Sequence, residues 1–328
     1  MILGMDVSKA KLDTALLLPG KRKWYDSRVD NTQKGFEKLV AFCERKSGES
    51  ITQILVVMEA TGVYHEAAAE AFHDAGCRVI IANPKRVRDF AKGLGLLSKN
   101  DTIDARALAR YGEVGEAQLW QPPAAEIREL RALLARLTAV EQDLRREENR
   151  WEKAQISNTP MIVRDSLMRS IEALRAERKR LLKAIEDHYN QHPGLKAERL
   201  LLQTIPAVGK VSSDHLLCLL RGRDFRNARQ AAALSGLIPL EYSSGSSVRG
   251  KPRLSKQGNP KLRAVLYMAS VSALQHNPAL KEIYMRLREK GKPALSALGA
   301  LMRHLVHIAF GVLKHQKPYN PALVSRIS

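Results

Sequence analysis

Short apolar runs separated by turn-prone residues fill much of the first third of the chain. Runs of this length, bounded by Gly, Pro, Asn and Asp, are typical of strands that are at least half buried. The first three lie so close together in sequence that they predict an antiparallel meander. The expected strands are Ile2–Val7, Lys11–Leu18, Lys21–Val29, Ile54–Met58 and Arg78–Ala82.

Amphipathic stretches separate the later strands. Thr32–Arg45 and Tyr64–Ala75 show helical periodicity, and Asp101–Tyr111 follows the last strand as a further helix. Alternation of strand and helix after a meander predicts a mixed sheet flanked by helices, which is an α/β fold.

A different pattern begins after Pro122-Pro123. Apolar residues recur at heptad a and d spacing in two segments, with Glu141 and Arg178 at the steps that break each series. The polar stretch Trp151–Pro160 separates the segments, so we expect two long helices. They form either a coiled-coil arm or a plain amphipathic pair packed on the body, and in both cases a spacer or an oligomerisation element. The apolar positions are Ile127, Leu130, Leu134, Leu137 and Leu144, then Leu167, Ile171, Leu174, Leu181 and Ile185.

The chain after His192-Pro193-Gly194 is compact and helical in pattern, with short loops. Residues 201–220 contain an apolar helix end, a Pro-x-x-Gly turn and a second helix, which predicts a helix-hairpin-helix that can hold phosphate at Gly209 and Lys210. A simple αα-hairpin is the alternative. The pattern thus predicts three regions: an α/β domain at 1–121, a helical arm at 122–192 and a helical C-terminal domain at 193–328.

Charge narrows the class of partner. The 328 residues contain 54 Lys and Arg against 34 Asp and Glu, a net charge of +20, which favours a polyanion. Three widely separated cysteines support neither a disulfide framework nor a zinc module. The longest apolar tract, Ala294–Leu313, is interrupted by Arg303, His304 and His307, so no membrane span is expected and the cytoplasm is the default location.

Four carboxylates are the main candidates for chemistry. Asp6 and Glu59 each end an apolar strand, and Asp101 and Asp104 are three residues apart at the start of a helix, on one face of it. Each has an ordinary explanation: Asp6 as a turn residue, Glu59 as a strand-end acid in water, and the Asp pair as a helix start. Together in one α/β unit they predict a site for Mg²⁺ or Mn²⁺, because unpaired buried acids are costly and a divalent cation turns their repulsion into coordination.

A hydroxyl-rich segment, Glu241–Gly250, precedes a basic one, and we expect it to be a flexible loop. Cations attract phosphate and ease the development of negative charge on a serine. The composition alone favours linker or phosphate-contact roles for the serines Ser243, Ser244, Ser246 and Ser247. Between residues 249 and 263 there are six basic residues and no acid: Arg249, Lys251, Arg253, Lys256, Lys261 and Arg263.

An ordered set of motifs along the chain resembles the insertion-sequence 110 family of bacterial transposases, also called DEDD transposases, which are related to pilin-inversion recombinases. The resemblance is collinear from Gly4 to the last helix. The motifs are Gly4-Met-Asp6-Val-Ser-Lys9, Glu59-Ala-Thr-Gly-Val-Tyr64, Asn83-Pro84, Lys99-Asn-Asp101-Thr-Ile-Asp104-Ala-Arg106, Ile205-Pro-Ala-Val-Gly209 and Ser244-Gly-Ser-Ser-Val-Arg-Gly250.

The resemblance implies a RuvC-like, RNase H-type first domain, a coiled-coil arm and a C-terminal transposase domain. It places Asp6, Glu59, Asp101 and Asp104 on the family's metal-binding tetrad and Ser244 on its nucleophilic serine. We also expect contacts to nucleic acid from Lys99, Arg106, Gly209, Lys210 and the six basic residues between 249 and 263.

The implied activity is DNA transposition or site-specific recombination. The family's members are guided by a bridge RNA that pairs with target and donor DNA, and they act as homo-oligomers, dimers or tetramers, with an active site shared between protomers. Two alternatives stay open: a RuvC-like metal-dependent junction nuclease that forms no covalent intermediate, and an architectural protein that binds nucleic acid. The serine separates the two enzymes, since hydrolysis leaves no protein–DNA adduct.

Overall fold

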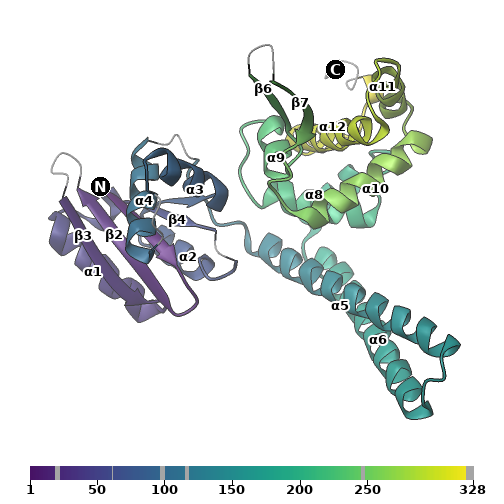
Figure 1. Cartoon of the computed structure of the whole chain (residues 1–328), viewed down its shortest axis with the longest axis horizontal. Coiled ribbons are helices and arrows are strands. Elements are labelled where there is room, and N and C mark those ends of the chain that lie inside the picture. The colour runs from purple at the N-terminus through teal and green to yellow at the C-terminus, as the bar shows by residue number, and fades with distance from the viewer. Residues whose placement is uncertain (19–22, 61, 97–99, 115–117, 245–247, 323–328) are drawn as a thin grey trace. The chain divides into compact units, whose positions relative to one another are not determined.

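The computed structural model describes residues 1–18, 23–60, 62–96, 100–114, 118–244 and 248–322, with side chains throughout except at 241–244 and 248–252. The chain divides into two compact units, Met1–Pro122 and Pro123–Ser328. Figure 1 shows a sheet flanked by helices in the first unit and a mainly helical second unit.

The described strands of the first unit form one mixed sheet in the order β3-β2-β1-β4-β5. The pairs β1–β2 and β2–β3 are antiparallel, whereas β4 runs parallel to β1 and β5 parallel to β4. This confirms the meander followed by parallel strands. The strands are β1 (Ile2–Val7), β2 (Lys11–Leu18), β3 (Lys23–Asp30), β4 (Leu55–Glu59) and β5 (Arg78–Ala82).

Two helices of this unit, α1 and α3, begin with polar caps. Thr32 accepts a hydrogen bond from the backbone N–H of Gly35, and Asn83 accepts from those of Lys85 and Arg86 with Pro84 at the first helical position. The helix that Asn83 caps was not predicted from the sequence. The elements are α1 (Gln33–Ser47), the 3₁₀ turn η1 (Ile51–Gln53), α2 (Glu66–Asp74), α3 (Pro84–Gly93) and α4 (Asp101–Val114).

Strand alternation divides the sheet between two cores. Leu3, Met5 and Val7 of β1 face a core that includes Phe36 of α1 and Phe72 of α2. The alternate residues face α4: Ile2 and Val57 pack in a second core with Leu108 and Ala109. The face under α4 therefore carries Ile2, Gly4 and Asp6 of β1.

Two long helices, α5 (Ala125–Ile156) and α6 (Met161–Gln191), begin the second unit and pack against each other. Arg178 lies 3.0 Å from Glu141, so the two polar residues that interrupt the heptads pair with each other. The predicted polar connection Trp151–Pro160 was too long, because α5 continues through Ile156.

The rest of the unit packs its helices around one large core. α12 is apolar and long enough to cross a membrane, yet Leu301, Leu305 and Ala309 are fully buried within this core. It therefore serves as the central core helix of the unit. The helices are α7 (Pro193–Gln203), α8 (Lys210–Arg221), α9 (Ala228–Leu234), α10 (Pro260–His276), α11 (Pro278–Glu289) and α12 (Ala294–His315).

A β-hairpin replaces the loop expected at Glu241–Gly250. β6 (Pro239–Ser244) pairs antiparallel with β7 (Val248–Leu254), with a register shift between Leu240 and Tyr242. The expectation of an all-helical C-terminal region was therefore wrong. Gly- and Ser-rich strands have weak intrinsic preference, and backbone pairing across the hairpin determines this one.

The three cysteines are free and buried. Burial raises the pKa of the Cys43 thiol to about 12 and that of Cys77 to about 11. Division of the second unit into an arm and a separate C-terminal domain at residues 192 and 193 stays a prediction.

Candidate functional site

Asp6 and Glu59 lie at the same end of neighbouring parallel strands. Met5 pairs with Met58, so the next residue of each strand lies at the same level. Residues two apart on a strand share one face of the sheet. Asp6 therefore lies on the same face as Gly4, and Glu59 on the same face as Val57, which is the face covered by α4. The two carboxylates thus share one edge and one face of the sheet.

α4 reaches this edge because Gly4 permits a very close approach. A Cβ atom at Gly4 would lie 1.9 Å from the carbonyl oxygen of Ala105 and 2.5 Å from the backbone nitrogen of Ala109. Any side chain here would displace the helix. Since Ala105 sits over Gly4, the preceding turn with Asp101 and Asp104 lies toward the end of β1 that bears Asp6.

Asn100, and not Asp101, caps α4. The Oδ1 atom of Asn100 accepts a hydrogen bond of 2.8 Å from the backbone N–H of Ile103. The Asp pair therefore does start the helix, but neither acid is its cap. Asp101 instead pairs with Arg28 of β3.

The electrostatics of Asp6 show that the four acids converge. Burial is the largest cause that raises the pKa of Asp6 from 3.8 to about 6, and the negative charges of Asp104, Asp101 and Glu59 contribute to the same rise. Each of these acids therefore lies close enough to Asp6 to affect its protonation.

Asp13 is a fifth carboxylate, which the sequence analysis did not predict. It pairs directly opposite Asp6 on β2 and also raises the pKa of Asp6. Arg28 pairs opposite Asp13 on β3, with its Nε 2.6 Å from Asp13 Oδ1 and its Nη2 3.2 Å from Asp101 Oδ2. The alignment of Asp6, Asp13 and Arg28 depends on the register of the three strands, which the apolar pattern does not specify.

The donor chemistry of this cluster fits a hard divalent cation. Carboxylate oxygens are the ligands that Mg²⁺ and Mn²⁺ prefer, and a nearby cation would reverse the repulsion that raises the pKa of Asp6. In the described part of the chain, no three Asp, Glu, His or Cys side chains are arranged closely enough to hold a metal ion. The acids are gathered at one edge but not closed around a cation.

Ser244 lies in the other unit, as the last residue of β6. Its backbone pairs with that of Val248. The side chains of Ser243 and Ser244 lie outside the described residues, and so do residues 245–247, which include Ser246 and Ser247. The role of Ser244 stays a prediction.

The expected nucleic-acid contacts have different surroundings. Lys99 and the side chains of Arg249 and Lys251 lie outside the described residues. Arg106 is engaged within the first unit, where its Nη2 lies 2.5 Å from Asp26 Oδ2. Arg263 donates a 2.7 Å hydrogen bond to the carbonyl oxygen of Gly258. The exposed residues are Gly209, Lys210, Arg253, Lys256 and Lys261.

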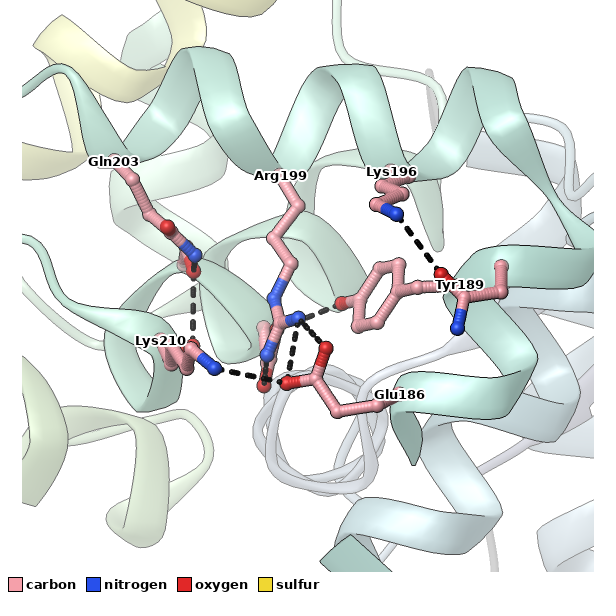
Figure 2. A network of polar contacts seen from close by, with 9 residues as sticks. Glu186, Tyr189, Lys196, Arg199, Gln203 and Lys210 are labelled. Carbon is pink, nitrogen blue, oxygen red and sulfur yellow. Dashed lines mark hydrogen bonds and ion pairs between the residues drawn. The ribbon is translucent and has the colours of Figure 1, made fainter. Parts of the chain in front are cut away.

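Figure 2 shows the polar network that ties Lys210 to the arm, with Arg199 at its centre. The guanidinium group of Arg199 is 2.7 Å from Asp214 and 3.0 Å from Glu186 of α6. Tyr189 donates a 2.7 Å hydrogen bond to Asp214, and the Nζ of Lys210 lies 3.3 Å from Glu186. The turn between α7 and α8 is thereby fixed against the base of the arm.

Comparison with known proteins identifies the family to which the chain is similar. Residues 3–155 match a DEDD transposase model of IS110 elements, and residues 199–285 match the transposase model of the IS116/IS110/IS902 family. The chain is similar to the pilin gene-inverting proteins of Moraxella lacunata and Moraxella bovis, each 29% identical over 320 residues, which is 97% of both chains.

A further similarity is to an uncharacterised protein of insertion element IS110 from Streptomyces coelicolor. It is 29% identical over 154 residues, which is 47% of this chain and 37% of that protein. The first family model covers the four acids of the carboxylate cluster, and the second lies within the second unit. The chain belongs to the IS110 family of transposases and DNA recombinases.

Proposed function

We propose that this transposase cuts and rejoins DNA through a covalent serine intermediate at a metal-dependent carboxylate site. The observation that carries the proposal is the convergence of Asp104, Asp101 and Glu59 on Asp6 at one edge of the sheet. The strand order β3-β2-β1-β4-β5, with a meander and two parallel strands, supports an RNase H-like assignment of this unit.

Asp6, Glu59, Asp101 and Asp104 are the residues that would hold Mg²⁺ or Mn²⁺. When bound, the ion supplies charge neutralisation at a phosphodiester. The chain's own residues position it: the sheet edge fixes Asp6 and Glu59, and the capped start of α4 fixes the other two. Asp13 and Arg28 add a charge pair beside them.

Ser244 is the proposed nucleophile. Its Oγ forms a bond to the scissile phosphorus, the bond to the 3′ oxygen breaks, and the serine proton passes to the leaving 3′ oxygen. The product is a 5′-phosphoserine and a free 3′-hydroxyl. A 3′-hydroxyl of the partner strand then attacks the phosphoserine and displaces the serine, which forms a new DNA phosphodiester bond. One phosphodiester bond is formed for each one broken, so no nucleotide cofactor is needed.

The partners proposed are target DNA, donor DNA and a bridge RNA that selects both. The net charge of +20 supports a polyanionic partner. We propose an active site shared between protomers of a dimer or tetramer, in which one protomer supplies the tetrad and another supplies Ser244. The arm at 122–192 is the proposed spacer between the α/β domain at 1–121 and the C-terminal domain at 193–328.

The test is capture of the intermediate. Wild-type protein, incubated with Mg²⁺, copurified RNA and cognate DNA, should yield an adduct that resists denaturant and disappears on protease digestion. Ser244→Ala should lose both adduct and recombination while keeping nucleic-acid binding. Ser243→Ala is the matched control and should keep measurable activity.

Cleavage that persists in Ser244→Ala without any adduct would instead assign a hydrolytic, RuvC-like junction nuclease. Sequencing the nucleic acid that copurifies with the protein tests the guide separately. A single structured RNA encoded beside the gene is the expected result, and its absence would remove the bridge RNA from the proposal.

A further inference from the structure

Two ion pairs of opposite polarity connect the edge strand β3 to α4. Arg106 of α4 is held by both oxygens of Asp26: its Nη2 lies 2.5 Å from Oδ2 and its Nε 3.1 Å from Oδ1. Arg28 of β3 reaches in the other direction, 3.2 Å to Asp101 of α4. Each element therefore contributes one acid and one base.

The spacing of these charges specifies where α4 lies along its own axis relative to β3. Asp26 and Arg28 are two residues apart on β3, so they lie on the same face of the sheet. Arg106 and Asp101 are more than one helical turn apart on α4. Sliding α4 along the sheet by one turn would separate both ion pairs. It would also bring one charge toward a like charge: Arg106 toward Arg28 in one direction, or Asp101 toward Asp26 in the other.

The apolar contact beneath α4 specifies this position only weakly. Its buried residues are mostly small, and Ala105 and Ala109 lie close over Gly4. Small side chains interdigitate little, so they resist sliding less than a row of large ones. The buried residues of α4 are Ala105, Ala107, Leu108, Ala109 and Gly112.

We propose that Arg106 and Asp26 form a positioning pair that fixes α4 along the sheet and thereby sets Asp101 and Asp104 against Asp6. This inference rests on the proposed metal-dependent function. The guanidinium group of Arg106 also lies 5.5 Å from the ring centre of Trp24, a cation–π contact that restrains it further. The planar fork of arginine suits such bidentate pairing, which lysine does not reproduce. Arg106 thus has a role distinct from the nucleic-acid contact expected from its motif.

Arg106 and Asp26 touch none of the four proposed ligands directly, which makes them suitable for a test. The full-length protein, free of nucleic acid, is titrated with Mn²⁺ and binding is followed by electron paramagnetic resonance. The variants are Arg106→Asp, Asp26→Arg and the double charge swap. Each single reversal should raise the Kd for Mn²⁺ by about 10- to 100-fold, the range found when groups that orient metal ligands are removed.

The double swap should return the Kd to within about twofold of wild type, because the ion pair re-forms with reversed polarity. Arg106→Gln and Asp26→Asn provide milder versions if a charge reversal prevents folding, which circular dichroism in EDTA would reveal. The matched control is the swap of Arg175 and Glu148, an exposed pair 2.9 Å apart in the second unit, which should leave the Kd unchanged.

The outcomes separate the two proposals. Absence of specific Mn²⁺ binding in the wild type would overturn the metal-dependent function itself. Specific binding in the wild type that is equally tight in Arg106→Asp or Arg106→Gln would overturn only the positioning role. Weak binding in both single variants without recovery in the double swap would also overturn it. Loss of DNA or RNA affinity at unchanged Kd for Mn²⁺ would reassign Arg106 to nucleic-acid contact.

Discussion

Asp6 and Asp13 lie directly opposite each other on β1 and β2, on the sheet face that packs against α4. Like charges placed opposite each other in an antiparallel pair are destabilising. Here Arg28 sits opposite Asp13 on the next strand and pairs with it at 2.6 Å, so Asp13 is compensated while Asp6 is left facing the other carboxylates.

The raised pKa of Asp6 predicts a loss of stability with rising pH when no metal is bound. Burial and neighbouring acids make the folded protein hold a proton at Asp6 up to about pH 6, whereas the unfolded chain releases it near pH 3.8. The stabilising contribution is therefore complete below pH 3.8 and lost by about pH 6. Because Asp6 is only partly buried, we expect a loss on the order of 1 kcal/mol.

Hydrogen exchange of β1 amides in EDTA, compared between pH 4.5 and pH 6.5 after correction for intrinsic rates, measures this loss. Asp6→Asn should remove the pH dependence. Asp104→Asn should reduce it more than Asp13→Asn, because Asp104 is the strongest and Asp13 the weakest of the acids acting on Asp6. Equal pH dependence in wild type and Asp6→Asn would contradict the electrostatic account.

Metal removal should abolish strand cleavage without unfolding the protein. Asp6→Asn and Asp104→Asn should be inactive at every Mg²⁺ or Mn²⁺ concentration, while their unfolding temperatures in EDTA should equal or exceed that of the wild type. Loss of a like charge relieves repulsion in the unmetallated cluster. Full cleavage by Asp6→Asn, or by wild type in EDTA, would remove the metal from the mechanism.

The buried pair of Arg199 and Asp214 should dominate the stability of the second unit. Both side chains are more than 90% buried. Arg199→Leu leaves Asp214 without its cation and should cost about 3–5 kcal/mol, and Tyr189→Phe, which removes a hydrogen bond to a charged group, about 1.5–3 kcal/mol.

Urea unfolding of the full chain gives both values. Lys183→Ala is the control on the same helix as Tyr189, since Lys183 and Asp187 form an exposed i,i+4 pair worth less than about 1 kcal/mol. If Arg199→Leu costs no more than Lys183→Ala, the network shown in Figure 2 does not hold α7 and α8 to the arm.

Nucleic-acid affinity should fall steeply with salt. Lys256 and Lys261 are exposed near the start of α10, so Lys256→Ala and Lys261→Ala should each flatten the slope of log K against log salt by about one for each phosphate that the lysine neutralises. Lys290→Ala, in an exposed position after α11, is the control. An unchanged slope in the Lys256 and Lys261 variants would place the nucleic-acid surface elsewhere, with the turn at Gly209 as the next candidate.

Periodicity was sufficient to predict the sheet. Three strands have the bounds that the apolar runs predicted: Ile2–Val7, Lys11–Leu18 and Arg78–Ala82. A strand that is buried on one or both faces must be apolar at its buried positions, so such runs locate it well. The helix at Pro84–Gly93 was not predicted. Asn83-Pro84 indicates the end of a strand and the start of a helix equally well, and it does both here: β5 ends at Ala82 and Asn83 caps α3.

The four acids of the candidate site could be recognised from the sequence. The neighbouring charges that compensate or repel them could not. Asp6, Glu59, Asp101 and Asp104 are recognisable from their places at element ends. The roles of Asp13 and Arg28 depend on cross-strand register, and the close approach at Gly4 depends on the path of α4. The hairpin at Pro239–Leu254 escaped detection because its residues carry no strand pattern of their own.

A site shared between protomers predicts complementation between two inactive proteins. Asp6→Asn lacks the carboxylate half and Ser244→Ala lacks the nucleophile, so each alone should give no product. If protomers exchange, random mixing leaves about a quarter of the shared sites with both halves intact. Recombination by the mixture, read out by product sequencing, should recover to about that level.

Mixing Asp6→Asn with Asp104→Asn is the control and should stay inactive, because both lack the same half. Inactivity of the first mixture, once mass spectrometry has shown mixed oligomers, would place the tetrad and Ser244 of one chain in the same site.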